Sequence, residues 1–127
     1  MEYTILKKLN GVNLLAMKSG KEFDIGDIVL LDFTPQSGHE QMGKRPALIV
    51  SNKIFIKFTK LAIVCPITST KRGVPIQIEL NNKTKTQGVI MCEQLKSLDL
   101  YARQAVFLEK APKNITRQVI EIIYSFF

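Results

Sequence analysis

Short apolar runs separated by polar turns make up most of the chain after residue 26. The run over residues 61–67 is almost wholly apolar, which is typical of a strand buried on both faces. The run over 74–80 alternates apolar and polar positions, which predicts a strand with one face in water. Together with similar runs, these segments predict strands over residues 27–33, 45–51, 61–67, 74–80 and 88–93, and a short one over 105–108.

The end of the chain follows a different pattern. Its apolar residues recur at the spacing of one helical face, and they are Ile115, Val119, Ile122, Ile123 and Phe126. We therefore predict a C-terminal amphipathic helix with Asn114 as its N-cap and Phe126 on its core face. Between the predicted strands, residues 52–60 are interpreted as a basic connector and residues 94–99 as one helical turn.

The order of these elements predicts a mainly β fold with minor α content. Strands that do not alternate with long helices argue against a parallel Rossmann-like sheet. Close turns between five to seven short, mostly antiparallel strands instead favour a small, strongly curved sheet or barrel over residues 26–127. Residues 1–25 show no clean period and are interpreted as an N-terminal extension or cap that packs on this domain.

Charge adds a class of partner to this picture. The 127 residues carry a net charge of +7 with a pI near 9.5, an excess that favours polyanionic partners over neutral ones. A soluble basic protein with solvated lysines is the alternative. Two cysteines inside apolar stretches, Cys65 and Cys92, are expected to be buried, and with one histidine they form no recognisable metal-ligand cluster. We expect no metal or other cofactor.

The sequence contains neither a membrane span nor an unbroken apolar signal segment. No stretch of about 18 apolar residues occurs, and Lys7, Lys8, Asn10 and Asn13 interrupt the beginning of the chain. We therefore expect a cytoplasmic protein without a membrane partner.

Two polar segments at strand ends are candidates for chemistry. The first runs from His39 to Pro46 and leads Arg45 directly into a strand, where a guanidinium can bind phosphate or pair with a surface carboxylate. The second begins with Thr68 and Ser69, whose hydroxyls can cap a turn or donate to a phosphate oxygen. The adjacent Lys71 and Arg72 can steer a polyanion or simply form a solvated turn. Within the first segment, His39 and Glu40 are candidate proton acceptors.

These residues occur within motifs that closely resemble the MazF/PemK toxins, in identity and in order. The matching segments are Gly26–Val29, Asp32–Pro35, Gly38–Ser51, Val64–Thr68, Lys71–Pro75 and Gly88–Asp99. The resemblance covers about residues 25–127, and it implies an SH3-like barrel of the CcdB/PemK type that forms a homodimer. It also implies a sequence-specific endoribonuclease that cuts single-stranded mRNA as the toxin of a toxin–antitoxin pair.

The resemblance assigns roles to individual residues. The family's essential arginine and threonine fall on Arg45 and Thr68, and its loop glutamate falls on Glu40. Its Glu-Gln pair falls on Glu93 and Gln94. Ser69 keeps the hydroxyl of a second threonine found in many relatives, and Lys44 stands at a variable position.

A metal-free mechanism suits these groups. The RNA's own 2′-hydroxyl would attack the phosphate while Arg45 stabilises the developing charge, with Glu40 ahead of His39 as base. The products would be a 2′,3′-cyclic phosphate and a 5′-hydroxyl. Gln41, Asn52 and Gln94 are candidate base readers, and His39, Lys44, Ser69, Lys71 and Arg72 are further candidate RNA contacts.

Partners and alternatives follow from the same reasoning. An acidic, partly disordered antitoxin peptide of the MazE kind would complement the positive charge and block the RNA groove. A gyrase-binding toxin like CcdB would use the C-terminal end instead. A noncatalytic RNA-binding barrel would bind RNA with salt-sensitive affinity and leave it whole.

Overall fold

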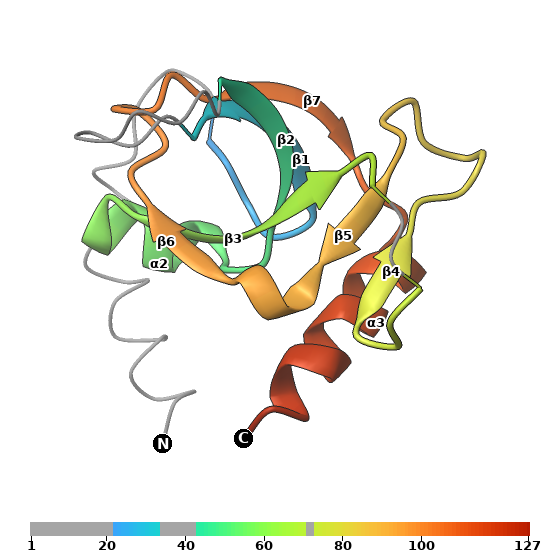
Figure 1. The fold of residues 1–127 in the computed structure, drawn as a ribbon. Coiled ribbons are helices and arrows are strands. Elements are labelled where there is room, and N and C mark those ends of the chain that lie inside the picture. The colour runs from blue at the N-terminus through green and yellow to red at the C-terminus, as the bar shows by residue number, and fades with distance from the viewer. Residues whose placement is uncertain (1–21, 34–42, 71–72) are drawn as a thin grey trace.

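The computed structural model describes residues 22–33, 43–70 and 73–127 (Figure 1). Strands dominate this part of the chain, as predicted. In chain order the elements are β1 (Asp27–Asp32), β2 (Lys44–Ile49), α2 (Lys53–Thr59), β3 (Ala62–Thr68), β4 (Gln77–Glu79), β5 (Val89–Met91), the 3₁₀ helix η2 (Cys92–Gln94), β6 (Lys96–Leu98), β7 (Val106–Lys110) and α3 (Lys113–Tyr124).

The seven strands form one strongly curved antiparallel sheet. Its order is β4-β5-β3-β2-β1-β7, and β6 is a side branch that pairs with β3. Strand β3 is therefore shared: its first half, Ala62–Val64, pairs with β6, and its last two residues pair with β5. Because the pairing path ends at β4 and at β7, the sheet curls like a barrel without closing.

Alternating residues of the central strands build two cores, one on each face of the curled sheet. One core joins residues such as Leu48 and Cys65 to the buried side of α3, which is formed by Ile115, Val119 and Ile123. The other core lies against α2 and contains Val29, Leu31, Phe33, Ala47, Ile49, Val64 and Ile56. Burial on both faces explains why the central strands are almost continuously apolar.

Two predicted elements differ in kind. The basic connector is a helix, α2, because the Asn52 side chain accepts a hydrogen bond from the Phe55 N–H at 2.9 Å and Ile56 packs into a core. The expected helical turn over 94–99 instead contains β6, because the edge of β3 is available there for pairing. Of the predicted strand 74–80, only Gln77–Glu79 pairs with a neighbour.

The C-terminal helix exists, but both predictions about its ends were wrong. Helix α3 begins at Lys113, with Pro112 in the N-cap position, so Asn114 lies inside the first turn. The helix ends at Tyr124, and Phe126 beyond it is 43 % exposed. The core face of α3 consists of Ile115, Val119 and Ile123, and Ile122 is partly buried against the same core.

Buried residues elsewhere agree with the sequence. Cys65 and Cys92 are free thiols inside the first core, as predicted. Phe23 packs into the second core, so the chain is part of the packed fold from at least that position. In the described segments, neither helix has the length and apolar character to cross a membrane.

Candidate functional site

Arg45 and Thr68 occupy opposite positions on neighbouring strands. Ala47 faces Pro66 in the β2–β3 register, and the same antiparallel register extended by two residues sets Arg45 against Thr68. Opposite residues of an antiparallel pair point to the same face of the sheet. The row continues on either side, because Leu31 faces Arg45 and Val89 faces Thr68. The sheet thus joins the two predicted motifs into one site.

The two residues share a groove at this end of the sheet. The groove has a volume of about 290 Å³ and is lined by Arg45, Pro46, Ile67, Thr68, Ser69, Thr70 and Gln87. Arg45 and Thr68 are each half-buried, whereas Ser69 is exposed. A ligand in the groove can therefore reach a guanidinium and at least two hydroxyls together.

Local contacts hold Thr68 in place. Its Oγ1 accepts a hydrogen bond from the Thr70 N–H at 3.1 Å, which leaves the hydroxyl hydrogen available for a ligand. Gly88 packs so closely behind it that an added Cβ would lie 2.6 Å from the Thr68 carbonyl oxygen. The backbone at Thr68 is thus enclosed between β2 and the beginning of β5.

A family model matches the part of the chain that contains the groove. The model describes a PemK-like, MazF-like toxin of type II toxin-antitoxin systems, and it matches residues 24–127. The chain belongs to this family.

Relatives of this MazF/PemK-family toxin cover most of its length. Endoribonuclease PemK from Escherichia coli is 33 % identical over 120 residues, which are 91 % of this chain and 90 % of that protein. Endoribonuclease toxin ChpB from Escherichia coli strain K12 is 34 % identical over 112 residues, 82 % of this chain and 93 % of that protein.

A solved structure agrees at the level of the fold. MazF from Deinococcus radiodurans, crystal form I, superposes with a TM-score of 0.76 at 36 % identity, covering 84 % of this chain and 97 % of that one. A MazE-MazF crystal structure from the same organism, form II, gives a TM-score of 0.78 at 36 % identity, with 84 % and 96 % covered.

The toxin's other predicted contacts are only partly gathered at the groove. Ser69 lines it, and Lys44 directly precedes Arg45 on β2. Asn52 does not line it: Asn52 follows the other end of β2 and uses its side chain to cap α2. Gln94 lies in η2, exposed and outside the groove lining. His39, Glu40, Gln41, Lys71 and Arg72 fall outside the described residues.

Sequence reasoning missed two residues of the groove in this toxin. Thr70 follows the Thr68–Ser69 pair and holds the Thr68 side chain through its N–H. Gln87 comes from the loop between β4 and β5, far from either motif in sequence. The only sequence signal for Gln87 is its place directly before Gly88, at the entrance to a strand.

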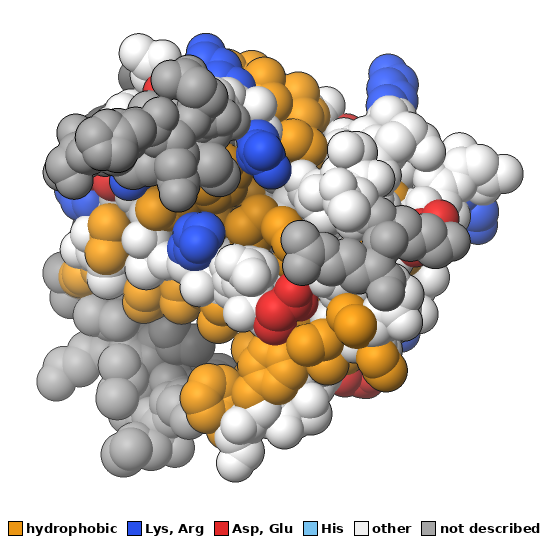
Figure 2. All heavy atoms as spheres, viewed as in Figure 1, with side chains coloured by type: hydrophobic (Ala, Val, Ile, Leu, Met, Phe, Trp, Pro, Cys, Tyr) orange, Lys and Arg blue, Asp and Glu red, His pale blue; other side chains and the backbone are white. Residues whose placement is uncertain are grey.

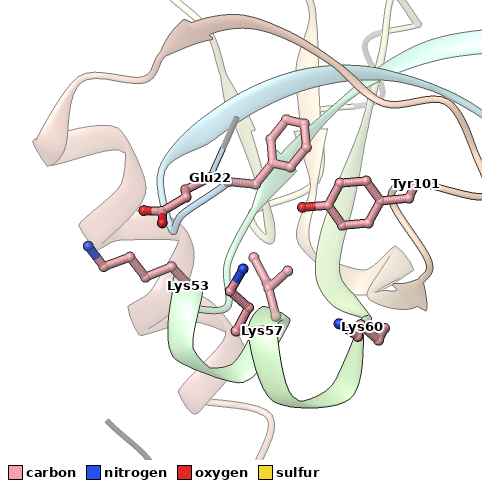
Figure 3. A pocket seen from close by; sticks show the side chains of 7 residues that line it. Glu22, Lys53, Lys57, Lys60 and Tyr101 are labelled. Atoms are coloured by element: carbon pink, nitrogen blue, oxygen red, sulfur yellow. The ribbon is translucent and has the colours of Figure 1, made fainter. Parts of the chain in front are cut away.

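A second hollow lies at the opposite end of the β2–β3 pair. It measures about 250 Å³, and Lys53, Lys57 and Lys60 of α2 and its C-cap surround it together with Glu22 and Tyr101 (Figure 3). The Tyr101 hydroxyl points into the hollow. Because β2 and β3 run between the two sites, these lysines do not contact the groove of Arg45 and Thr68.

An apolar strip forms a third surface feature. Figure 2 shows hydrophobic side chains gathered near the end of α3, below a region with lysine and arginine side chains. Leu95, Tyr124 and Phe127 line a hollow of about 470 Å³ there, and Phe127 is 97 % exposed. Exposed apolar side chains that gather in one area are typical of interaction surfaces.

The titratable groups of the described segments offer no metal site. No three His, Cys, Asp or Glu side chains within residues 22–33, 43–70 and 73–127 are placed to hold a metal ion. Burial raises the pKa of Cys65 to about 12 and that of Cys92 to about 11, and the nearby Glu93 carboxylate adds to both shifts. Both thiols therefore stay protonated, which argues against a nucleophilic role.

Proposed function

We propose that this toxin cleaves single-stranded mRNA at the groove of Arg45 and Thr68, without a metal, by attack of the RNA's own 2′-hydroxyl. Endoribonuclease activity itself follows from the family and from relatives that match most of the chain. The observation that carries the finer proposal is the cross-strand placement of one guanidinium and one hydroxyl in a shared groove.

Arg45 suits the stabilisation of the transition state. As the 2′-oxygen bonds to phosphorus, negative charge grows on the two non-bridging oxygens, and a guanidinium can donate to both at once. Thr68 can donate its hydroxyl to the same phosphate and so fix its orientation. Arginine is a poor proton donor because its guanidinium stays protonated in proteins, so we assign Arg45 charge stabilisation first and acid catalysis second.

The proton balance needs a base and a source of protons. A base removes the 2′-hydroxyl proton, the bond from phosphorus to the 5′-oxygen breaks, and solvent protonates that oxygen. We assign the base to Glu40, with His39 as the alternative, on the basis of the family resemblance. The products are a 2′,3′-cyclic phosphate and a 5′-hydroxyl.

Cleavage of single-stranded RNA in EDTA tests the proposal. Replacing Arg45 with alanine should slow cleavage about 100-fold or more, as loss of one transition-state donor does in other enzymes. Thr68→Val, which keeps the shape but removes the hydroxyl, should also slow it. Lys57→Ala, a cation removed from the distant lysine hollow, is the matched control and should cleave at the wild-type rate.

Three outcomes would contradict this mechanism. Folded wild-type protein that leaves RNA intact in EDTA would refute it, as would products carrying a 3′-hydroxyl. An Arg45→Ala variant that cuts normally would remove Arg45 from the chemistry. Melting curves of each variant separate a chemical role from loss of the fold.

The apolar strip near the end of α3 and the positive net charge each suggest a protein partner. We propose that a second copy of the chain covers Tyr124, Phe127 and their neighbours, giving a homodimer. We further propose that an acidic MazE-like antitoxin blocks the groove, since the net charge of +7 favours such a partner. The Deinococcus radiodurans relative has been crystallised as a MazE-MazF complex.

One observation favours a second candidate function. A CcdB-like toxin binds gyrase through its C-terminal end, and Phe126, predicted to be turned toward the core, is instead exposed there. Inhibition of gyrase supercoiling by protein that leaves RNA uncut would favour this alternative. RNA that is bound but never cut would favour the noncatalytic barrel instead.

A further inference from the structure

The loop between β4 and β5, residues 80–88, forms one wall of the groove. A hydrogen bond of 2.9 Å from the Leu80 N–H to the Gly88 carbonyl closes its base. Its last side chain, Gln87, lines the groove together with Arg45 and Thr68. In Figure 1 the loop projects from the sheet beside β5, the strand that pairs with the end of β3.

A carboxylate from β7 anchors this loop. Glu109 accepts hydrogen bonds from the Thr86 N–H at 2.6 Å, the Thr86 hydroxyl at 2.7 Å and the Lys85 N–H at 3.1 Å. The buried Thr84 hydroxyl lies 2.7 Å from the Thr86 carbonyl and so links the two sides of the turn. Lys85 and Thr86, the two residues before Gln87, are therefore held by several hydrogen bonds, although the loop itself lies on the surface.

The side chain of Gln87 is also oriented. Its Nε2 donates to the Thr84 carbonyl oxygen at 3.1 Å, which uses one of its two N–H groups. The other N–H and Oε1 have no partner among the described residues. Gln87 thus presents one donor and one acceptor side by side at the groove, and this pair matches the edge of a nucleobase.

We propose that Gln87 is a specificity-determining residue of the toxin, whose carboxamide reads the edge of a nucleobase next to the scissile phosphate. This inference rests on the proposed ribonuclease function. Val89 faces Thr68 across the sheet, and Gln87 lies two residues before Val89, so Gln87 is close to the hydroxyl that we assign to phosphate binding. When Arg45 and Thr68 hold the phosphate of a nucleotide, the base attached to that nucleotide lies in or beside the same groove. Because Thr84 and Glu109 already hold the loop and the Gln87 carboxamide in place, binding a base costs little further conformational entropy.

The test compares cut sites across a pool of single-stranded RNAs by sequencing the 5′ ends of the fragments. Gln87→Met keeps the length of the side chain but removes both hydrogen-bonding atoms, and Gln87→Ala removes the side chain. Base preference at one position beside the cut should fall about fivefold to 150-fold, the range expected for loss of a paired base contact. Preferences at the other positions should remain. Asn82→Ala, an exposed amide on the same loop outside the groove lining, is the matched control.

The outcomes separate this inference from the function on which it depends. If wild-type protein cuts no RNA, the proposed function fails. If wild-type cuts and both Gln87 variants keep the same preference within about twofold, the inference is overturned. A uniform loss of rate at all sites, with an unchanged preference, also overturns it, because Gln87 would then support the groove without reading a base.

Discussion

Replacing Gly88 with alanine tests whether the close approach of β5 to β3 positions Thr68. Gly88 has φ +131°, where L side chains are strained, and an added Cβ would lie 2.6 Å from the Thr68 carbonyl oxygen and 3.0 Å from Ile67 Cγ2. Strained backbone of this kind costs about 1–3 kcal/mol, and overpacking costs about 1–3 kcal/mol more. We expect the free energy of unfolding to fall by about 4 kcal/mol.

Gly73→Ala is the matched control. Gly73 has φ +70°, but no atom of the described residues lies within 4 Å of its added Cβ, so only backbone strain of about 1–2 kcal/mol applies. For a chain of 127 residues, each 1 kcal/mol corresponds to about 4 °C in melting temperature. The Gly88 variant should melt about 15 °C below wild type and the Gly73 variant about 6 °C below it.

Thermal and urea unfolding at one fixed protein concentration measure these losses. Cleavage should be measured well below both melting temperatures, where a displaced Thr68 slows the Gly88 variant beyond its loss of folded protein. Equal melting temperatures for the two variants would refute the steric argument. Normal cleavage by a strongly destabilised Gly88 variant would refute the claim that this contact positions Thr68.

Three further predictions concern charge and burial. Burial opposes ionisation of Glu109, but hydrogen bonds from Thr86 and Lys85 outweigh this effect and lower its pKa. The ionised Glu109 therefore stabilises the fold above its unfolded-state pKa, and this stabilisation is lost as pH falls through its folded-state pKa. Between about pH 6 and pH 3 the melting temperature of wild type should fall more than that of Glu109→Gln, and parallel curves would refute this. Both buried thiols should resist a thiol-reactive disulfide reagent in the folded protein at mildly alkaline pH and react on denaturation, whereas rapid labelling of native protein would show that they are accessible. Lys57→Glu should leave the pattern of RNA cut sites unchanged, and an altered pattern would extend the RNA path to the lysine hollow.

Several local elements could be predicted because their signals are short-range. The strands of the central sheet, the C-terminal helix and the burial of Cys65 and Cys92 follow from apolar runs and spacing. Helix α2 was missed because its apolar residues lack a clean helical period and its stability depends on the Asn52 cap and on Ile56 in the core. Strand β6 was missed because its three residues become a strand only by pairing with the edge of β3.

The candidate site divides in the same way. The motifs around Arg45 and Thr68 can be identified from the sequence, because the family resemblance depends on residue identities and their order. Their meeting in one groove depends on the antiparallel register of β2 and β3, a long-range pairing that no local pattern specifies. Gln87 enters that groove only because Gly88 allows β5 to approach Thr68 and Glu109 anchors the loop from another strand. The sequence alone therefore determined which chemical groups are present, and the tertiary structure decided which of them act together, because side chains distant in the chain become neighbours only when the sheet forms.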